Sequence, residues 1–153
     1  MILKISEILK PEAIMMKMKA REKLAVIKEL VDYMVANKFV KDGEEFVKAL
    51  CKRENLESTG IGDGIAIPHA RTNAVKGLIL AFARSPEGVD FSAIDGKPSH
   101  LIFLIASPDD KKSEYIVALA KLSRLLRKHD VREQLKRADS PKEILDIIKK
   151  NEE

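Results

Sequence analysis

The chain has 153 residues, and its 28 lysines and arginines against 24 aspartates and glutamates give a formal net charge of +4 at pH 7. This length fits one domain better than two, and a hydrophobic content of 45% is enough to form a core. The bases are interspersed with acids and aromatic residues make up only 5%, which disfavours nucleic-acid binding. No apolar run approaches the ~20 residues that cross a bilayer and the start of the chain is not a secretory signal, so we expect a cytoplasmic protein.

The first third of the chain predicts one strand followed by two helices. A short apolar stretch over residues 14–18 indicates a strand. Between residues 19 and 38, apolar side chains recur at helical spacing with charges on the opposite face. A second helix is predicted over residues 43–53, because Asp42 followed three residues later by Glu45 is typical of a capping box.

The middle third predicts the strands of a sheet. Residues 64–68 indicate a strand that ends at Pro68, because proline lacks the N–H that a strand ladder needs. Near-continuous apolar runs over residues 78–84 and 101–106 predict strands that are buried on both faces.

The last third predicts three helices, over residues 113–128, 130–138 and 140–150. Apart from the strand over residues 14–18, helices therefore come first, strands lie in the centre, and helices close the chain. This order predicts one α/β domain over residues 1–153, with helices on both faces of its sheet.

The most informative segment is Thr59–Arg71, which combines three glycines, an apolar step, a proline and His69. A lone histidine is more often a surface or core residue than a catalyst. Here Pro68 favours extended backbone at Ile67, which places His69 at a strand end, pointing out of the sheet. An imidazole with a reference pKa of roughly 6.5 keeps a free lone pair at cytoplasmic pH, so it can attack a phosphoryl group or bind a metal.

The three glycines of this segment suit an anion. They lack the glycine spacing of a dinucleotide-binding fingerprint and the Lys-Ser or Lys-Thr of a P-loop. Backbone N–H groups of such a loop can converge on an anion, and Thr59 adds a hydroxyl. A plain loop is the alternative explanation.

Two arginines near the histidine are further candidates. Arg53 lies near the end of a predicted helix, where it suits the helix C-terminus or clamps phosphate oxygens. Arg71 would share the face of His69 in a strand. A metal site is not predicted, because the three histidines are far apart and paired cysteines are absent, and no Gly-x-Ser-x-Gly elbow indicates a hydrolase.

A long string around the histidine resembles the phosphorylation site of enzyme IIA domains of the bacterial sugar phosphotransferase system: Arg53-Glu54, then Ser58-Thr-Gly-Ile-Gly-Asp-Gly-Ile-Ala-Ile-Pro-His-Ala-Arg71. The type is the fructose/mannitol family, which includes the nitrogen-regulatory IIA proteins. Outlying segments are similar too, and the resemblance covers nearly the whole chain. It implies a mixed central sheet of about five strands flanked by helices on both faces, with the active histidine in a shallow cleft.

The resemblance also implies a phosphotransferase activity that uses no bound cofactor and no metal. The phosphocarrier HPr would give its phosphoryl group to Nε2 of His69, with Arg53 as the active-site arginine. The domain would then pass the group to a IIB domain for sugar uptake, or use its phosphorylation state to regulate a target protein. The membrane is reached only indirectly through a IIC transporter, which selects the sugar.

Within this mechanism we expect Ile61 and Ile65 to exclude water from the phosphohistidine. We expect the phosphate to be bound, besides Arg53, by the hydroxyl, backbone N–H groups and guanidinium of six residues: Thr59, Gly60, Ile61, Gly62, Gly64 and Arg71.

One position departs from the family pattern. Members that transfer phosphate usually carry a second histidine near the start of the helix after the last long strand, and Tyr115 stands at this place. A tyrosine hydroxyl can donate one hydrogen bond to a phosphate oxygen, but it cannot carry the positive charge of an imidazolium. Two roles therefore stay open, a phosphoryl carrier in sugar uptake and a regulatory module that binds targets according to the phosphorylation state of His69.

Overall fold

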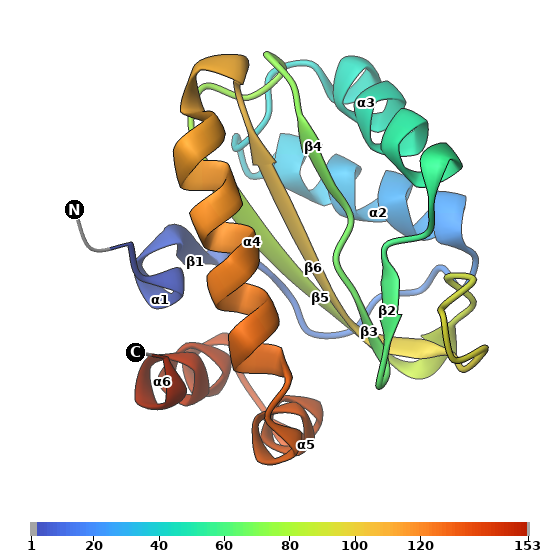
Figure 1. The fold of residues 1–153 in the computed structure, drawn as a ribbon, viewed down its shortest axis with the longest axis vertical. Coiled ribbons are helices and arrows are strands. Elements are labelled where there is room, and N and C mark those ends of the chain that lie inside the picture. Colours follow the sequence, from blue (N-terminus) through green and yellow to red (C-terminus); the bar gives the residue numbers. More distant parts are fainter. Residues whose placement is uncertain (1–2, 153) are drawn as a thin grey trace.

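The computed structural model describes residues 3–152, which form a central sheet with helices packed around it (Figure 1). In chain order the elements are α1 (Ile5–Ile8), β1 (Leu9–Met15), α2 (Lys23–Ala36), α3 (Gly43–Leu56), β2 (Gly60–Gly62), β3 (Ile65–Ala66), β4 (His69–Arg71), β5 (Ile79–Val89), β6 (Ser99–Ser107), the short 3₁₀ turn η1 (Asp109–Lys111), α4 (Lys112–Leu126), α5 (His129–Arg137) and α6 (Pro141–Asn151). Within these residues, no helix combines the length and the apolar character that crossing a membrane requires.

The sheet is mixed, with the strand order β1-β5-β6-β3-β2, and β4 also pairs with β6. The long strands β5 and β6 are antiparallel, β1 runs parallel to β5, and both β3 and β4 run parallel to β6. Phe82 and Phe103 lie directly opposite each other in β5 and β6, with ring centroids 4.7 Å apart, and both are fully buried. Strands as apolar as these require cover on both faces.

Helices provide that cover. In Figure 1, α4 crosses the front of the sheet and α2 lies behind it. α3 packs against α2 and β4, while α6 packs against β1 and α5. The N-caps follow the sequence signals, because Asp42 Oδ1 accepts the N–H of Glu45 at 3.1 Å and Ser140 Oγ accepts the N–H of Glu143 at 3.2 Å. The predicted α/β class, with helices on both faces, is confirmed.

β3 ends at Ala66, just before Pro68, which agrees with the predicted stop, but pairing with β6 resumes after the proline in β4, which begins at His69. Ile65 pairs with Leu101 and His69 pairs with Ile105, which keeps β3 and β4 in the same register along β6. Pairing resumes because a proline lacks only its N–H, and the Pro68 carbonyl still accepts the N–H of Ile105 at 3.1 Å. His69 therefore begins β4 as part of the sheet.

The first strand lies earlier in the chain than predicted, at residues 9–15 instead of 14–18. Pro11 made this segment a poor strand candidate. It is tolerated because β1 is an edge strand, and because the register with β5 is irregular between Leu9 and Ile14.

The strand β2 was not predicted, and it gives the sheet six strands in place of about five. Glycine-rich segments have little intrinsic preference for strands. The missed signal is the Asp63-Gly64 pair, a strong two-residue hairpin sequence. Both residues have positive φ, 56° and 79°, as the tight turn between β2 and β3 requires.

The two ends of the described chain lie close together. The carboxylate of Glu152 accepts the N–H of Ile5 at 2.7 Å and the N–H of Ser6 at 3.2 Å, so it caps the first turn of α1. In Figure 1 the two ends lie on the same side of the molecule, away from α3.

Candidate functional site

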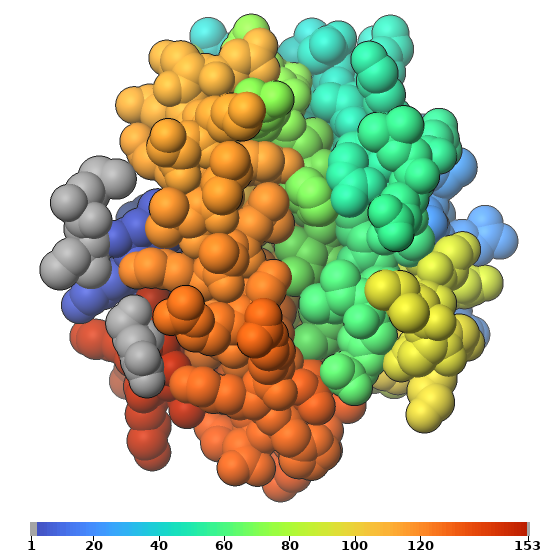
Figure 2. All heavy atoms as spheres, viewed as in Figure 1, coloured from blue at the N-terminus to red at the C-terminus, as the bar shows by residue number. Residues whose placement is uncertain are grey.

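A cleft of about 930 Å³ opens between α3 and α4, with β4 and the residues that follow it along its floor. Figure 2 shows this cleft as the hollow between α4 (orange) and α3 (teal), with the green of β4 at the bottom. Four side chains that the sequence analysis singled out line it together: Arg53, His69, Arg71 and Tyr115.

His69 is half-buried at the start of β4, and a backbone contact fixes its ring. Its Nδ1 lies 2.7 Å from the carbonyl oxygen of Ile67. A carbonyl only accepts, so Nδ1 carries the proton of the neutral ring and Nε2 keeps its lone pair. Burial lowers the pKa of His69, the Ile67 carbonyl opposes this, Arg53 lowers the pKa further and Glu54 raises it. The ring is therefore a neutral base with a free Nε2 at pH 7.

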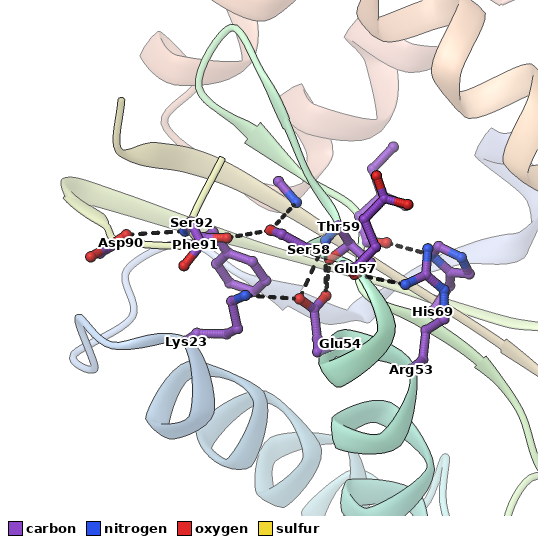
Figure 3. Close-up of polar contacts among 12 residues, drawn as sticks. Lys23, Arg53, Glu54, Glu57, Ser58, Thr59, His69, Asp90, Phe91 and Ser92 are labelled. Atoms are coloured by element: carbon purple, nitrogen blue, oxygen red, sulfur yellow. Dashed lines mark hydrogen bonds and ion pairs between the residues drawn. The ribbon is translucent and has the colours of Figure 1, made fainter. Parts of the chain in front are cut away.

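Two guanidinium groups add positive charge to the cleft. Arg53 comes from the last turn of α3, and its Nη1 donates to the carbonyl of Glu57 at 2.7 Å. Figure 3 shows the Arg53 side chain beside the ring of His69. Arg71 is exposed on β4, two residues after the histidine. Across residues 3–152 neither arginine forms an ion pair with a carboxylate, so both retain charge for an anion.

Tyr115 closes the cleft from α4. Its ring centroid lies 6.0 Å from that of His69, and the ring planes are inclined by 52°. Burial raises the pKa of Tyr115 to about 12, although Arg53 and Arg71 act in the opposite direction. The hydroxyl is therefore protonated at any physiological pH and can donate one hydrogen bond.

The predicted phosphate-binding loop lies outside this cleft. None of its five residues lines the cleft: Thr59, Gly60, Ile61, Gly62 and Gly64. The positive φ of Gly62 and Gly64 serves the turn between β2 and β3, and the Gly60 N–H donates to Ser58 Oγ at 3.0 Å. The glycines thus shape a hairpin that leads the chain back to the histidine.

The two isoleucines that we expected to exclude water also lie elsewhere. Ile65 is 1% exposed within the core and Ile61 is 45% exposed, and neither lines the cleft. Leu56, at the end of α3, and Leu119, on α4, supply apolar surface there. Helical spacing could have identified Leu119, but the 80% exposed Leu56 has no sequence signal of its own.

A buried polar network lies beside the cleft and was not predicted. Glu54 follows Arg53 in α3 and is only 6% exposed. One of its oxygens lies 3.1 Å from Lys23 Nζ, and both of its oxygens accept the N–H of Thr59, at 3.2 and 3.3 Å. The Thr59 hydroxyl also donates to Glu54. The carboxylate is thereby satisfied, as a buried charge must be.

Comparisons with known proteins agree with this geometry. Over residues 7–151 the chain matches the family described as phosphoenolpyruvate-dependent sugar phosphotransferase system, EIIA 2. It is 40% identical over 144 residues to the PTS system fructose-specific EIIA component of Haloferax volcanii, which covers 94% of each protein. It is 39% identical to the PTS system fructose-specific EIIABC component of Bacillus subtilis over 98% of this chain, but it spans only 24% of that longer protein.

Solved structures give the same answer. The crystal structure of nitrogen regulatory protein IIA-Ntr from Neisseria meningitidis is similar with a TM-score of 0.87 and 34% identity, over 94% of this chain and 98% of that one. The complex of enzyme IIA mannitol and phosphorylated enzyme IIB mannitol from Escherichia coli contains a chain similar with a TM-score of 0.78 and 27% identity, over 93% of this chain and 99% of that one. The chain therefore belongs to the EIIA 2 family of the phosphoenolpyruvate-dependent sugar phosphotransferase system, whose fructose-, mannitol- and nitrogen-regulatory-type members it resembles in sequence and fold.

Proposed function

We propose that this chain is a cytoplasmic phosphoryl carrier that accepts a phosphoryl group from HPr on Nε2 of His69 and passes it to a IIB domain for sugar uptake. One observation carries the proposal. The bond between His69 Nδ1 and the Ile67 carbonyl leaves Nε2 open in a cleft that also contains Arg53 and Arg71. Membership of the EIIA 2 family supports the phosphoryl carrier role in general.

The transfer needs positioning and charge more than covalent machinery. The Nε2 lone pair of His69 forms a bond to phosphorus while the bond between phosphorus and the donor's nitrogen breaks, and that electron pair returns to the donor. Nδ1 keeps its proton, and the Ile67 carbonyl stabilises the positive charge that the ring gains. Arg53 and Arg71 oppose the negative charge of the phosphoryl oxygens.

Three further groups complete the proposed site. The Tyr115 hydroxyl donates to one phosphoryl oxygen. Leu56 and Leu119 present apolar surface that limits the access of water, which would hydrolyse a phosphohistidine. No cofactor takes part. Transfer to the acceptor follows the same path in reverse, with Nε2 of His69 as the leaving group.

The second candidate is a regulatory module that binds a target protein according to the phosphorylation state of His69. The TM-score of 0.87 with a nitrogen regulatory protein IIA-Ntr favours it. Tyr115, where transferring members usually have a second histidine, favours it too. In that role the phosphoryl group acts as a removable negative charge at the mouth of the cleft.

The experiment incubates the protein with phosphoenolpyruvate, enzyme I and HPr, and weighs the intact product. We expect one added phosphoryl group that is lost in acid and is absent from His69→Ala. No modification in the presence of partners that phosphorylate a known IIA domain would overturn both candidates. Subsequent transfer to a IIB domain favours the carrier. Selective capture of a cellular protein by one of the two phosphorylation states, without transfer to IIB, favours the regulator.

A further inference from the structure

We propose that Glu54 is a positioning residue for the reacting histidine, acting through a chain of hydrogen bonds from its buried carboxylate to the imidazole of His69. This inference rests on the proposed phosphoryl transfer at His69. It assigns a role to a side chain that touches neither the cleft nor the phosphoryl group.

The two neighbours Arg53 and Glu54 face in different directions from one helix. Successive residues of an α-helix are ~100° apart, so the end of α3 directs Arg53 into the cleft and Glu54 into the interior. In Figure 3 Lys23 lies on one side of Glu54 and Thr59 lies next to its carboxylate, while Arg53 and His69 lie on the side away from Lys23. A buried carboxylate is tolerated only where hydrogen-bond donors and an opposite charge compensate it, and Lys23 and Thr59 do so here.

The first link of the chain joins α3 to the strand segment that follows it. Glu54 accepts the backbone N–H of Thr59 with both carboxylate oxygens and also accepts its hydroxyl. Lys23, from α2, fixes the carboxylate from the opposite side at 3.1 Å. The position of the Thr59 backbone is therefore set by two helices at once.

Two further links lead from Thr59 to the ring. The carbonyl of Thr59 accepts the N–H of Ile67 at 3.0 Å, and the carbonyl of Ile67 lies 2.7 Å from Nδ1 of His69. Each contact fixes the next, so the carboxylate orients the carbonyl that sets the tautomer and the direction of Nε2. Because Arg53 precedes Glu54 in α3, the same hydrogen bonds also fix the position of the arginine relative to the histidine.

The charge of Glu54 adds to this mechanical role. The charged groups around His69 are Arg53 and Glu54 from α3 and Arg71 from β4 itself, and the titratable but neutral Tyr115 faces it from α4. More distant charges along the cleft are Asp42, Glu45, Lys48, Lys52 and Asp109. Among the groups that shift the pKa of His69, Glu54 is the carboxylate that raises it, against burial and Arg53.

The test compares Glu54→Gln with Glu44→Gln, which removes an exposed carboxylate from the first turn of the same helix. Imidazole ¹⁵N NMR of the unphosphorylated proteins reports the tautomer and the titration midpoint of His69. We expect Glu54→Gln to lower the midpoint and to mix the two tautomers, and Glu44→Gln to match the natural protein. In transfer from HPr, kcat should fall roughly ten- to a hundredfold with little change in KM.

Two Thr59 variants refine the test. Thr59→Ser keeps every hydrogen bond to Glu54 and should give the same His69 spectrum as the natural protein. Thr59→Val keeps the backbone contacts but loses the hydroxyl, so its His69 midpoint should lie between those of the natural protein and Glu54→Gln. An unchanged His69 tautomer and midpoint in folded Glu54→Gln overturns the proposal. If that variant does not fold, hydrogen exchange of the backbone amides in the natural protein replaces it as the test. Thr59 and Ile67 amides that exchange as fast as amides in exposed loops would show that the proposed hydrogen bonds do not persist, and would overturn the proposal.

The NMR result does not depend on phosphoryl transfer. A natural protein that HPr fails to phosphorylate, together with a changed His69 spectrum in Glu54→Gln, would remove the proposed function and leave the positioning intact. Normal phosphorylation of the natural protein, together with an unchanged His69 spectrum in Glu54→Gln, would support the proposed function and remove the positioning role of Glu54.

Discussion

Two histidines lie at opposite ends of β6, and the charged residues around them differ more than the burial and hydrogen bonds of the two rings do. His100 is at the start of β6, whereas His69 pairs with Ile105 near its end, roughly 16 Å along the strand direction. Both are half-buried, and both place Nδ1 at a backbone carbonyl, at 2.9 Å from Ser85 for His100 and 2.7 Å from Ile67 for His69. A fixed ring with an available Nε2 is therefore not what distinguishes a reactive histidine.

The charges around the two rings make the difference. The cavity of about 350 Å³ beside His100 also contains the carboxylates of Asp63, Asp95 and Glu133, and Lys136 there is paired with Glu133 at 3.2 Å. The larger cleft at His69 has two guanidinium groups, neither of which forms an ion pair within the described residues. Along the whole cleft at His69, four basic residues (Lys48, Lys52, Arg53 and Arg71) face three acidic ones (Asp42, Glu45 and Asp109), whereas three basic and three acidic residues line the cavity at His100. An incoming phosphoryl group therefore meets a small excess of positive charge at one end of the sheet and a balanced mixture at the other.

The largest expected effect comes from exchanging one histidine at a time. His69→Gln should abolish phosphorylation by HPr, whereas His100→Gln should keep it, because only His69 lines the cleft that contains Arg53 and Arg71. Intact-mass measurement after incubation with enzyme I, HPr and phosphoenolpyruvate reads out both. Residual acid-labile phosphate on His69→Gln would show that a second residue accepts the group.

The arginines test whether charge explains the difference. Arg53→Ala should slow transfer roughly 100-fold, about 2.7 kcal/mol, because it removes one preorganised donor from the developing charge. Arg53→Lys should recover part of the rate, since an ammonium supplies charge without the planar fork. Arg132→Ala is the matched control beside His100, where the guanidinium donates to the carbonyls of Leu126 and Arg127. Equal losses in Arg53→Ala and Arg132→Ala would refute the electrostatic explanation.

The pH profile gives a smaller effect. Burial lowers the pKa of His69, so the folded protein takes up this proton at lower pH than the unfolded chain does. The rate of phosphorylation by HPr should be constant down to a pH of about 6.5 and should fall less than about tenfold at pH 5.5, because most of the imidazole is still neutral above its lowered pKa. By the same sign, this group lowers the free energy of unfolding as the pH falls below about 6.5. A His69 midpoint above 6.5 in imidazole NMR would contradict this prediction.

The smallest expected effect is at Tyr115. Tyr115→Phe removes one neutral donor and should slow transfer only about threefold to tenfold, close to the ~1 kcal/mol of a single neutral hydrogen bond. Tyr115→His restores a group that can carry charge, and we expect faster transfer from HPr. Stopped-flow or quenched-flow rates measure both. Identical rates for tyrosine, phenylalanine and histidine at this position would show that α4 contributes nothing to the phosphoryl site.

The sequence predicted the side chains of the cleft better than it predicted their supports. His69 and Arg53 stand out because proline and glycine constrain the backbone around one, and helix spacing places the other. Glu54 could not be predicted in the same way. A glutamate in the last turn of an amphipathic helix normally faces water, and its burial becomes favourable only when Lys23 and Thr59 meet it in three dimensions.

The strands show the same division between local and tertiary information. The apolar runs of β5 and β6 were predictable because hydrophobicity alone specifies a strand that is covered on both faces. The short β2 and the proline-containing β1 exist because neighbouring strands offer partners, which local propensity does not record. Local propensity likewise does not indicate that Gly62 and Gly64 shape a hairpin turn, so the sequence predicts only their phosphate-binding role.

The hydrogen bonds between the Glu152 carboxylate and the first turn of α1 have a consequence for partner domains that are joined to this chain by a linker. A IIB or other domain joined to either end of this fold would start from nearly the same point, on the side away from α3. A domain of this size is about 40 Å across. A flexible linker spans such a distance with on the order of 50 residues, and the effective concentration of the tethered partner at the cleft falls when the linker is much shorter or longer. Linker length, more than the choice of end, would then set how often a fused partner meets His69.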